Sequence, residues 1–245
     1  MKNQILSSGL AVIAFHYFAG TCLALTPVRE SFNVALNPAR WIVGGSPYAK
    51  LQQGSGRLNF TVGPTSTEED YASAELYGNQ PGYNESWQVI VDVSNTANAG
   101  DDVGAGLYIY NPSSYTNILY FEFYGDGKGR QGGFQVSILK DAFGNYLEPH
   151  LINNPRVKKG SLRITFNKTT KLITFFCDKT GSADGYQWKK VGTFSPTGVG
   201  GDRRLNWNMN PTTGRFGIGL EAFGDNRLVR NGRVNMDNFI LKASK

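Results

Sequence analysis

Hydrophobic and polar residues alternate one by one along two neighbouring segments, 104–111 and 117–125. Successive side chains of a β-strand point to opposite faces, so this period of two predicts a pair of strands. One face is apolar and is expected to pack in a core: Leu107, Ile109, Leu119, Phe121 and Phe123. The other face carries four tyrosines and one carboxylate: Tyr108, Tyr110, Tyr120, Tyr124 and Glu122. We interpret this second face as a candidate binding surface.

Short runs rich in Val, Ile, Phe, Tyr and Thr, separated by Gly, Asn, Asp, Pro or Ser, continue from residue 57 to residue 241. They predict strands at 57–62, 72–77, 87–94, 106–110, 118–124, 134–139, 162–166, 172–177, 187–193, 216–222 and 234–241. No segment has the pattern of a long amphipathic helix. Strands at this spacing indicate an all-β protein, an antiparallel two-sheet jelly-roll sandwich. Long loops are expected at 63–71, 141–159 and 195–213, where binding residues tend to lie.

The strand at 87–94 places Trp87 and three valines on an apolar face, with Gln88, Ile90 and Asp92 on the other. If this strand shares a sheet with the two tyrosine-bearing strands, Gln88 and Asp92 extend the candidate surface. Trp41 and Trp87 are expected in the core.

The N-terminus has one lysine, an apolar run over residues 5–20, and small residues at 22 and 24. This pattern predicts a secretory signal peptide at 1–24, with a single domain at 25–245. An uncleaved membrane anchor and a lipid anchor at Cys22 are the alternatives. After cleavage no membrane span is expected, and the protein would be secreted or periplasmic.

The mature segment keeps one cysteine, Cys177, and one histidine, His150, and removal of Lys2 leaves 24 basic against 19 acidic residues. No internal disulfide is therefore expected in the mature segment. A single histidine also argues against catalytic triads that use histidine and against zinc sites with several histidines. Cys177 lies in an apolar run and is expected to be a buried, inert thiol. The basic residues are scattered, which is typical of a solvated surface, with an acidic polysaccharide or anionic cell surface as the functional alternative. No nucleic-acid recognition motif accompanies the charge.

Several phrases resemble the concanavalin A-like lectin and glucanase superfamily, with a laminin G-like jelly roll. They are the opening Phe32-x-x-x-Leu36-Asn37-Pro38-x-Arg40-Trp41, the strand at 56–62, the Trp87-led strand, and the closing segment 234–241 with Asp237-Asn238-Phe239. The resemblance implies a jelly-roll fold over nearly the whole mature chain, and a sheet face that binds carbohydrate. A shared fold does not by itself fix a function.

The glucanase branch of that superfamily carries an acidic cluster, Glu-x-Asp-x-Glu, on one strand, where alternate positions place nucleophile and proton donor together. The strand at 118–124 offers Glu122 alone, and Glu75 and Glu221 are isolated on their strands. A catalytic pair of Glu122 with Asp92 is the alternative reading, as an extracellular glycoside hydrolase or polysaccharide lyase.

The tyrosine rings offer flat apolar area to the C–H faces of sugars, while Glu122 and Gln88 can hydrogen-bond hydroxyls. Trp207, in a predicted loop, and Trp188, in the predicted strand at 187–193, are secondary ring candidates. Tyrosines also stabilise exposed sheets without any ligand, because cross-strand aromatic pairs contact one another.

No cofactor is expected, although calcium is possible. Asp101, Asp102, Asp126 and Asp225 are weak ligand candidates, because turn chemistry explains Asp beside Gly equally well. The sequons at Asn59, Asn84 and Asn167 matter only in a host that glycosylates its exports.

The sequence thus predicts an exported, non-catalytic, lectin-like domain whose partner is a polysaccharide or other glycan. The alternatives are the hydrolase or lyase above, and a structural or adhesive surface protein whose tyrosines only pack.

Overall fold

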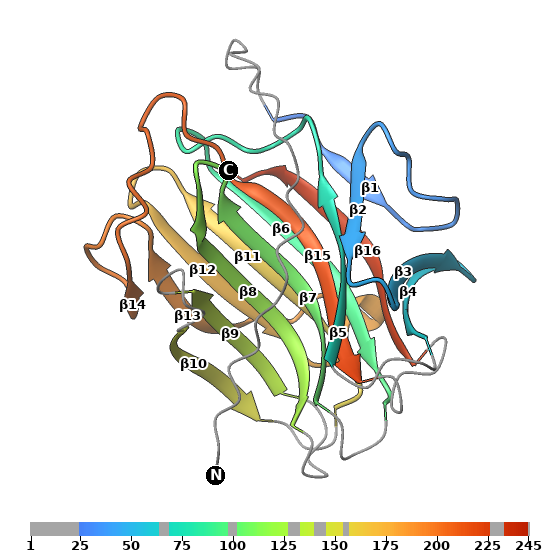
Figure 1. Ribbon diagram of the computed structural model, residues 1–245. Helices are drawn as coiled ribbons and strands as arrows, with labels where there is room; N and C mark the ends of the chain where they lie inside the picture. The colour runs from blue at the N-terminus through green and yellow to red at the C-terminus, as the bar shows by residue number, and fades with distance from the viewer. Residues whose placement is uncertain are drawn as a thin grey trace.

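The protein consists of two β-sheets that pack face to face (Figure 1). The computed structural model describes residues 25–63, 69–97, 102–126, 133–139, 146–153, 157–225 and 233–244. The predicted signal peptide at 1–24 lies outside the described residues. Within them the strands dominate, as predicted, and one short 3₁₀ helix, η1 (Ser182–Asp184), is present. No helix in the described ranges is long and apolar enough to cross a membrane.

Sheet A has the strand order β14-β13-β12-β11-β6-β16-β4-β3, and β1 pairs with β16. Its strands are β1 (Val28–Glu30), β3 (Ala49–Gly54), β4 (Arg57–Val62), β6 (Trp87–Asn95), β11 (Lys159–Asn167), β12 (Leu172–Asp178), β13 (Lys189–Ser195), β14 (Arg203–Arg204) and β16 (Val234–Ala243). All of its pairs are antiparallel except the short β13–β14 pair, which is parallel.

Sheet B has the order β10-β9-β8-β7-β15-β5-β2, and every pair is antiparallel. Its strands are β2 (Trp41–Gly45), β5 (Glu69–Leu76), β7 (Asp102–Asn111), β8 (Ser114–Asp126), β9 (Gly133–Leu139), β10 (Tyr146–Asn153) and β15 (Gly217–Asp225). Sheet B forms the layer nearer the viewer in Figure 1. The antiparallel two-sheet architecture predicted from the turn spacing is confirmed.

The core lies between the sheets and is built from alternate residues of the strands. The apolar face predicted for β7 and β8 is buried: Leu107, Ile109, Leu119, Phe121 and Phe123. Trp87 and Trp41 are also buried, as predicted, and the Trp87 ring lies 5.2 Å from Phe216 and 5.9 Å from Phe166, centroid to centroid. Such large interlocked rings dominate the burial of apolar area. Packing of these rings therefore contributes much of the stability of the fold.

Cys177 on β12 is unpaired and fully buried, which confirms the expectation from its apolar surroundings. Burial raises the pKa of its thiol above the ordinary value, because the thiolate is poorly solvated there. The thiol therefore stays protonated and inert at neutral pH.

Three features of the topology differ from the expectations. β6 belongs to sheet A, whereas β7 and β8 belong to sheet B, so these three strands do not share a sheet. β10 occupies part of the expected loop at 141–159 and pairs with β9. β1, β2 and β3 precede the first predicted strand. The jelly-roll connections send consecutive strands to opposite sheets, which local patterning does not encode.

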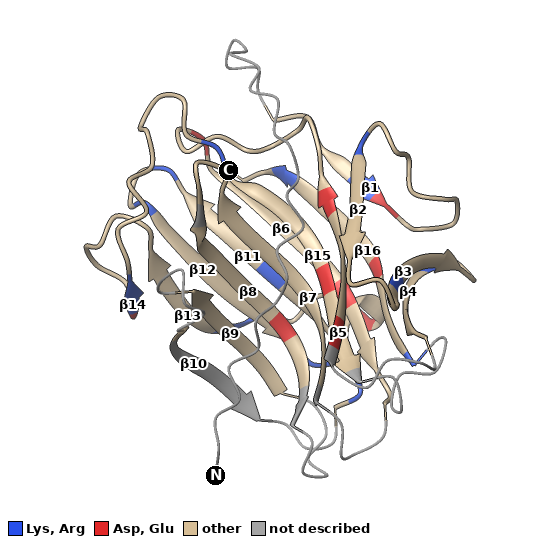
Figure 2. Ribbon diagram, in the orientation of Figure 1, with Lys and Arg blue, Asp and Glu red and all other residues tan. Residues whose placement is uncertain are grey.

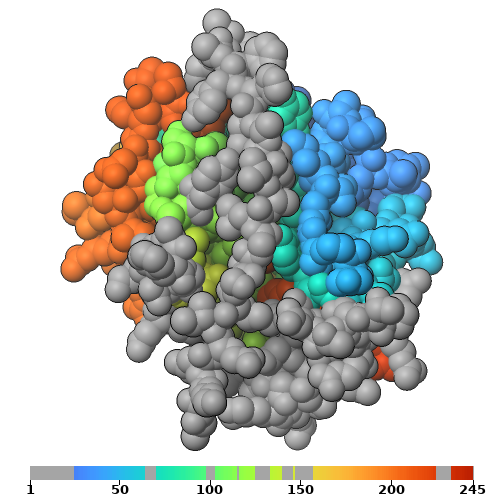
Figure 3. All heavy atoms as spheres, viewed as in Figure 1, coloured from blue at the N-terminus to red at the C-terminus, as the bar shows by residue number. Residues whose placement is uncertain are grey.

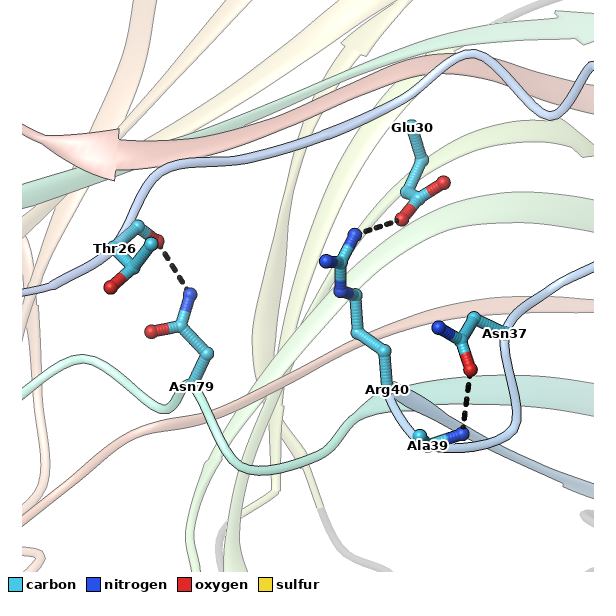
Figure 4. A network of polar contacts seen from close by, with 6 residues as sticks. All are labelled: Thr26, Glu30, Asn37, Ala39, Arg40 and Asn79. Atoms are coloured by element: carbon cyan, nitrogen blue, oxygen red, sulfur yellow. Dashed lines mark hydrogen bonds and ion pairs between the residues drawn. The ribbon is translucent and has the colours of Figure 1, made fainter.

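The N-terminal part of the described chain is tied down by polar contacts (Figure 4). The Arg40 guanidinium forms an ion pair with Glu30, with 2.7 Å between Nη1 and Oε1. The Asn79 amide donates to the carbonyl oxygen of Thr26 at 2.5 Å. Asn37 accepts a hydrogen bond from the backbone N–H of Ala39 at 2.9 Å and shapes the turn before β2. The contacts of Arg40 and Asn79 tether the two ends of the segment 26–30, which pairs with β16 through β1.

Candidate functional site

The outer side of sheet B, facing away from sheet A, gathers the predicted tyrosines. In the β7–β8 pairing Tyr108 lies opposite Tyr120, Gly106 opposite Glu122, and Gly104 opposite Tyr124. Tyr110 follows on the same side of β7, because alternate residues of a strand share a face. The placement of these five predicted residues on one face is therefore confirmed. We call the surface formed by Tyr108, Tyr110, Tyr120, Tyr124 and Phe223 the tyrosine face.

Three of these rings lie over glycines of a neighbouring strand. Gly217 and Gly219 of β15 pair with Tyr110 and Tyr108, respectively. A Cβ atom at Gly217 would lie 1.9 Å from the Tyr110 ring, and one at Gly219 would lie 2.3 Å from the Tyr108 ring. The phenyl ring of Phe223 occupies the space above Gly104 in the same way, at 2.3 Å. The rings can settle against the sheet only because these positions lack side chains.

Four of the rings form a strip across neighbouring strands, and Tyr124 and Phe223 form a separate pair. The Tyr108 centroid lies 6.1 Å from Tyr110, with 28° between the planes, and 6.3 Å from Tyr120. Tyr120 lies 6.4 Å from Tyr146 on the side of β10, and Tyr124 lies 5.7 Å from Phe223. These separations are within the range of direct aromatic contact. The strip is a platform of rings rather than a set of isolated tyrosines.

Carboxylates lie among the rings, and Figure 2 shows red segments on β5, β8 and β15. Glu221 and Glu122 both pair with Gly106, from opposite sides. Since adjacent strands are about 4.8 Å apart, the two backbones are separated by roughly 10 Å. Glu75 of β5 pairs with Gly219 of β15, and its carboxylate accepts a hydrogen bond from the Tyr110 hydroxyl. Sequence reasoning treated Glu75 and Glu221 as isolated, because only the register of β5 and β15 brings them to the tyrosines.

The side chains that carry a full charge at neutral pH on the strands of this surface are acidic. The strands of sheet B contain no lysine or arginine. The pKa values of Tyr108 and Tyr120 are raised well above the ordinary value, first by burial and then by nearby carboxylates, among them Glu221. Both phenols therefore remain neutral hydrogen-bonding groups at any physiological pH. Tyr108, Tyr120, Tyr124 and Glu221 are partly exposed, whereas Tyr110, Glu75 and Glu122 are buried. The accessible part of this surface therefore consists of tyrosine rings, hydroxyls and the Glu221 carboxylate.

Replacing Glu75 by glutamine is expected to increase stability at neutral pH. Burial raises the pKa of Glu75, an effect opposed by the hydrogen bond from Tyr110. The folded chain thus binds this proton more tightly than the unfolded chain, and the free energy of unfolding falls as the pH rises from the ordinary to the raised pKa. Urea denaturation at several pH values should show this decline in the wild type and a weaker one in Glu75→Gln. Equal pH dependence in the two proteins would contradict the assignment.

Two predicted site residues lie elsewhere. Gln88 and Asp92 are on β6, in sheet A, so they cannot extend the tyrosine face. Asp92 accepts hydrogen bonds from Ser161, Ser182 and Asn238 on the outer side of sheet A. The alternative reading with Glu122 and Asp92 as a catalytic pair is therefore wrong, because the two carboxylates lie on opposite sheets of the sandwich.

Trp207 was expected to offer its ring to a ligand, but the side chain is fully buried. Its ring packs 5.2 Å from Phe194, while its carbonyl oxygen accepts hydrogen bonds from the amides of Asn111 and Asn117. An exposed loop position was inferred from Pro and Gly content, yet the ring closes one end of the core. The other secondary candidate, Trp188, stacks on Tyr186 over sheet A.

A polar pocket of about 430 Å³ opens beside this end of the core. It is lined by Asn111, Ser113, Ser114, Thr116, Asn117 and residues Leu205, Asn206, Trp207 and Asn208. Two of its amides are committed to the Trp207 carbonyl. These two hydrogen bonds join the turn between β7 and β8 to the segment that carries Trp207. The other polar groups that line the pocket are uncharged amides and hydroxyls.

The metal predictions fall largely outside what the structure describes. Asp101 and the side chains of Asp102, Asp126 and Asp225 are not among the described parts. The backbone register places Asp102 opposite Asp126 and Asp225 opposite Glu69, at one end of sheet B. Among described side chains no cluster of three metal-ligating residues occurs. Calcium binding at these aspartates stays a prediction.

The signal that sequence reasoning missed is a match between two short motifs. Gly217-Ile-Gly219 on β15 faces Tyr108-Ile-Tyr110 on β7, and each glycine receives one ring. Glycine in a strand interior often marks a close approach of another group. Alternating glycines in one predicted strand and alternating aromatics in another therefore could have suggested that β7 and β15 pair.

Comparisons with solved structures place this arrangement among known folds. A xylan β-1,4-xylosidase from Bacillus halodurans C-125 matches with TM-score 0.58 and 17% identity, over 94% of this chain. The chain spans only 41% of that xylosidase. Lectin II from Ulex europaeus matches with TM-score 0.57 and 11% identity, covering 90% of this chain and 99% of the lectin. The carbohydrate recognition domain of Emp46p matches with TM-score 0.53 and 14% identity, covering 87% and 94%.

No protein-family model matches the chain, and no curated protein matches its sequence. Identities this low establish the fold and not the activity. The two-sheet architecture, its strand pairing and these structural neighbours agree with one another and with the phrases at the two ends of the chain. The protein has the two-sheet jelly-roll sandwich fold that these solved structures share.

Proposed function

We propose that this protein is an exported, non-catalytic domain that binds a neutral glycan on the tyrosine face. The observation that carries the proposal is the seating of Tyr108 and Tyr110 over Gly219 and Gly217. Tyrosines that only reinforce a sheet need no glycines beside them, since cross-strand pairs form between ordinary side chains. Because β15 has glycines at the alternate positions 217 and 219, the neighbouring rings of β7 can lie over it and form a flat aromatic surface.

The chemistry of the tyrosine face suits a sugar chain. Pyranose C–H faces pack on aromatic rings, and ring hydroxyls donate hydrogen bonds to carboxylates. Glu221 and Glu122 border the rings across Gly106, and the partly exposed Glu221 offers such an acceptor, whereas the buried Glu122 is a second, less accessible carboxylate. Because sheet B carries acids and no lysine or arginine, a neutral glycan is favoured over a uronate or sulfate polymer. Structural neighbours include a lectin solved with galactose and a xylosidase.

The proposal predicts that a Tyr108→Ala, Tyr120→Ala double variant loses at least about tenfold in glycan affinity, because each stacked ring is worth about 1 kcal/mol. The measurement is a pull-down of the protein with neutral soluble and insoluble polysaccharides, with and without calcium, assaying reducing ends in the same tubes. Tyr48→Ala is the matched control, since Tyr48 is 51% exposed and outside the tyrosine face. Equal retention of all three proteins, with the double variant folded, would favour the structural or adhesive alternative.

The second candidate function is glycoside hydrolysis, favoured by the placement of Glu122 and Glu221 on either side of Gly106. Carboxyl groups about 6.5–9.5 Å apart are typical of inverting glycosidases, in which a water attacks between them. Release of reducing ends by the wild type, lost in both Glu122→Gln and Glu221→Gln while binding persists, would establish this reading. Retention without new reducing ends would establish the lectin-like one.

A further inference from the structure

The outer side of sheet A holds an arginine stacked between aromatic rings. Arg163 of β11 pairs with Ile90 of β6 and with Phe176 of β12, and Phe176 pairs in turn with Lys190 of β13. The carbon Cζ of Arg163 lies 4.1 Å from the Phe176 ring centroid and 4.6 Å from that of Trp188. Distances below about 6 Å mark cation–π contact. The guanidinium thus contacts two aromatic rings.

A fourth group extends the stack and fixes it in place. The Tyr186 ring lies 4.7 Å from Trp188, with 18° between the planes. The segment that carries both rings is anchored, because the Gln187 N–H donates to Asp178 and the Ser182 hydroxyl donates to Asp92. We call Phe176, Arg163, Trp188 and Tyr186 the arginine stack. The sequence does not show that these four side chains lie together, because they come from β11, β12 and the β12–β13 connection, which are separated by turns.

The hydrogen-bonding groups of this guanidinium are unused. Within the described residues Arg163 makes no hydrogen bond and no ion pair, and its Nε is buried without a partner. The two Nη atoms are not among the buried unpartnered atoms, so they reach the surface. Burial lowers the pKa of Arg163, although an arginine remains charged in proteins. Leaving a charged, partly buried donor group without an acceptor costs free energy that a bound anion would return.

The surroundings favour an anion. The basic residues of the strands lie on sheet A: Arg29, Lys50, Arg57, Lys159, Arg163, Lys189, Lys190, Arg203, Arg204 and Lys242. Two carboxylates, Asp92 and Asp178, lie beside the stack on this side, and both are engaged by hydrogen-bond donors: Asp92 by Ser161, Ser182 and Asn238, and Asp178 by Thr180 and Gln187. The strands of sheet B thus carry acids without lysine or arginine, whereas the strands of sheet A carry these ten basic residues together with four acids, Glu30, Asp92, Asp178 and Asp237.

Beside the stack runs a row of uncharged polar groups. Thr165 lies two residues from Arg163 on the same side of β11, and it pairs with Gln88 of β6 and Thr174 of β12. Lys242 of β16 pairs with Gln88. Hydroxyl and amide groups of this kind exchange hydrogen bonds with sugar hydroxyls. Gln88, assigned by its sequence to the tyrosine face, belongs to this row instead.

We propose that the arginine stack is a second binding site, which takes a carboxylate or sulfate group of an anionic polysaccharide. The two Nη atoms of Arg163 would donate in parallel to two oxygens of the anion, as guanidinium groups commonly do. Lys190 would add a second charge at the edge, and the row of Gln88, Thr165 and Thr174 would contact the sugar next to the anion. This site is separate from the tyrosine face and independent of it.

The test measures the affinity of the purified full chain for polygalacturonate, dextran sulfate and neutral dextran. We expect the wild type to bind at least one charged polymer, the polymer identifying carboxylate or sulfate, and to ignore dextran. Arg163→Gln should weaken this binding about tenfold or more, and Arg163→Lys should not restore it, because lysine lacks the planar fork. Arg204→Gln is the control, since it removes the same charge from the exposed edge strand β14.

Binding should also be visible in the fluorescence of Trp188, which the anion approaches through Arg163. Trp41, Trp87 and Trp207 are buried in the core, so Trp188→Phe should remove the signal while retaining most of the affinity. If Arg163→Gln does not fold, Lys190→Gln provides the second variant, because Lys190 is exposed. It should weaken binding several-fold.

Three results would overturn the proposal: neither charged polymer binds, Arg204→Gln loses as much affinity as Arg163→Gln, or Lys190→Gln binds as the wild type does. The Tyr108→Ala, Tyr120→Ala variant separates the two proposed sites, since it should keep the anionic ligand and lose the neutral one.

Discussion

Gly219→Ala is expected to lose at least about tenfold in glycan affinity while keeping the fold. The added Cβ would lie 2.3 Å from two carbons of the Tyr108 ring, closer than any real contact, so the ring must lift off β15. Tyr108 is half-buried and can move outward, and overpacking of this kind costs about 1–3 kcal/mol of stability. The platform, however, loses its central ring. Affinity for the bound neutral polysaccharide and urea denaturation measure the two effects separately.

Gly44→Ala is the matched control, because Gly44 of β2 also belongs to sheet B and a Cβ there meets only the Ser73 hydroxyl, at an ordinary 3.5 Å. A double variant, Gly219→Ala with Tyr108→Ala, tests the mechanism. If the glycine acts only by seating that ring, the glycine substitution adds no further loss once the ring is gone. Full affinity in Gly219→Ala, or equal losses in Gly219→Ala and Gly44→Ala, would show that the seating of Tyr108 does not matter.

Local patterning predicted the tyrosine face because one hairpin, β7–β8, carries most of it. In adjacent antiparallel strands the alternation of Tyr108 and Tyr120 with core residues determines the shared side. Glu75 and Glu221 were missed as members, although both were noticed as single acids. Their strands join the hairpin through long-range pairing, and register between distant strands leaves only a faint trace in one sequence.

Assignment of strands to sheets failed for a related reason. Gln88 and Asp92 lie on a strand whose alternation was interpreted correctly, with Val89 and Val91 in the core. Either sheet of a sandwich presents an inner and an outer face, so alternation alone cannot say which sheet a strand joins. β6 enters sheet A between β11 and β16, and its polar face therefore lies on the opposite outside of the molecule from the tyrosines.

Trp207→Ala is expected to destabilise the protein by about 3–5 kcal/mol, the largest effect predicted here for a single residue. The indole is fully buried and contacts Phe194 at 5.2 Å and Phe216 at 6.5 Å, so its removal leaves a cavity at the end of the core that rigid strands cannot close. Urea denaturation measures the loss. The hydrogen bonds from Asn111 and Asn117 go to the backbone carbonyl and do not depend on the side chain.

Trp207→Phe separates a packing role from a binding role. The indole Nε1 is buried without a hydrogen-bond partner, so phenylalanine gives up apolar volume but loses no hydrogen bond. Its cost should therefore be well below that of Trp207→Ala, and glycan affinity should be unchanged. A folded Trp207→Phe protein with lost affinity would return Trp207 to the binding site. An empty cavity of this size costs contact energy. Unchanged stability in Trp207→Ala would therefore mean that this end of the core packs equally well without the indole ring.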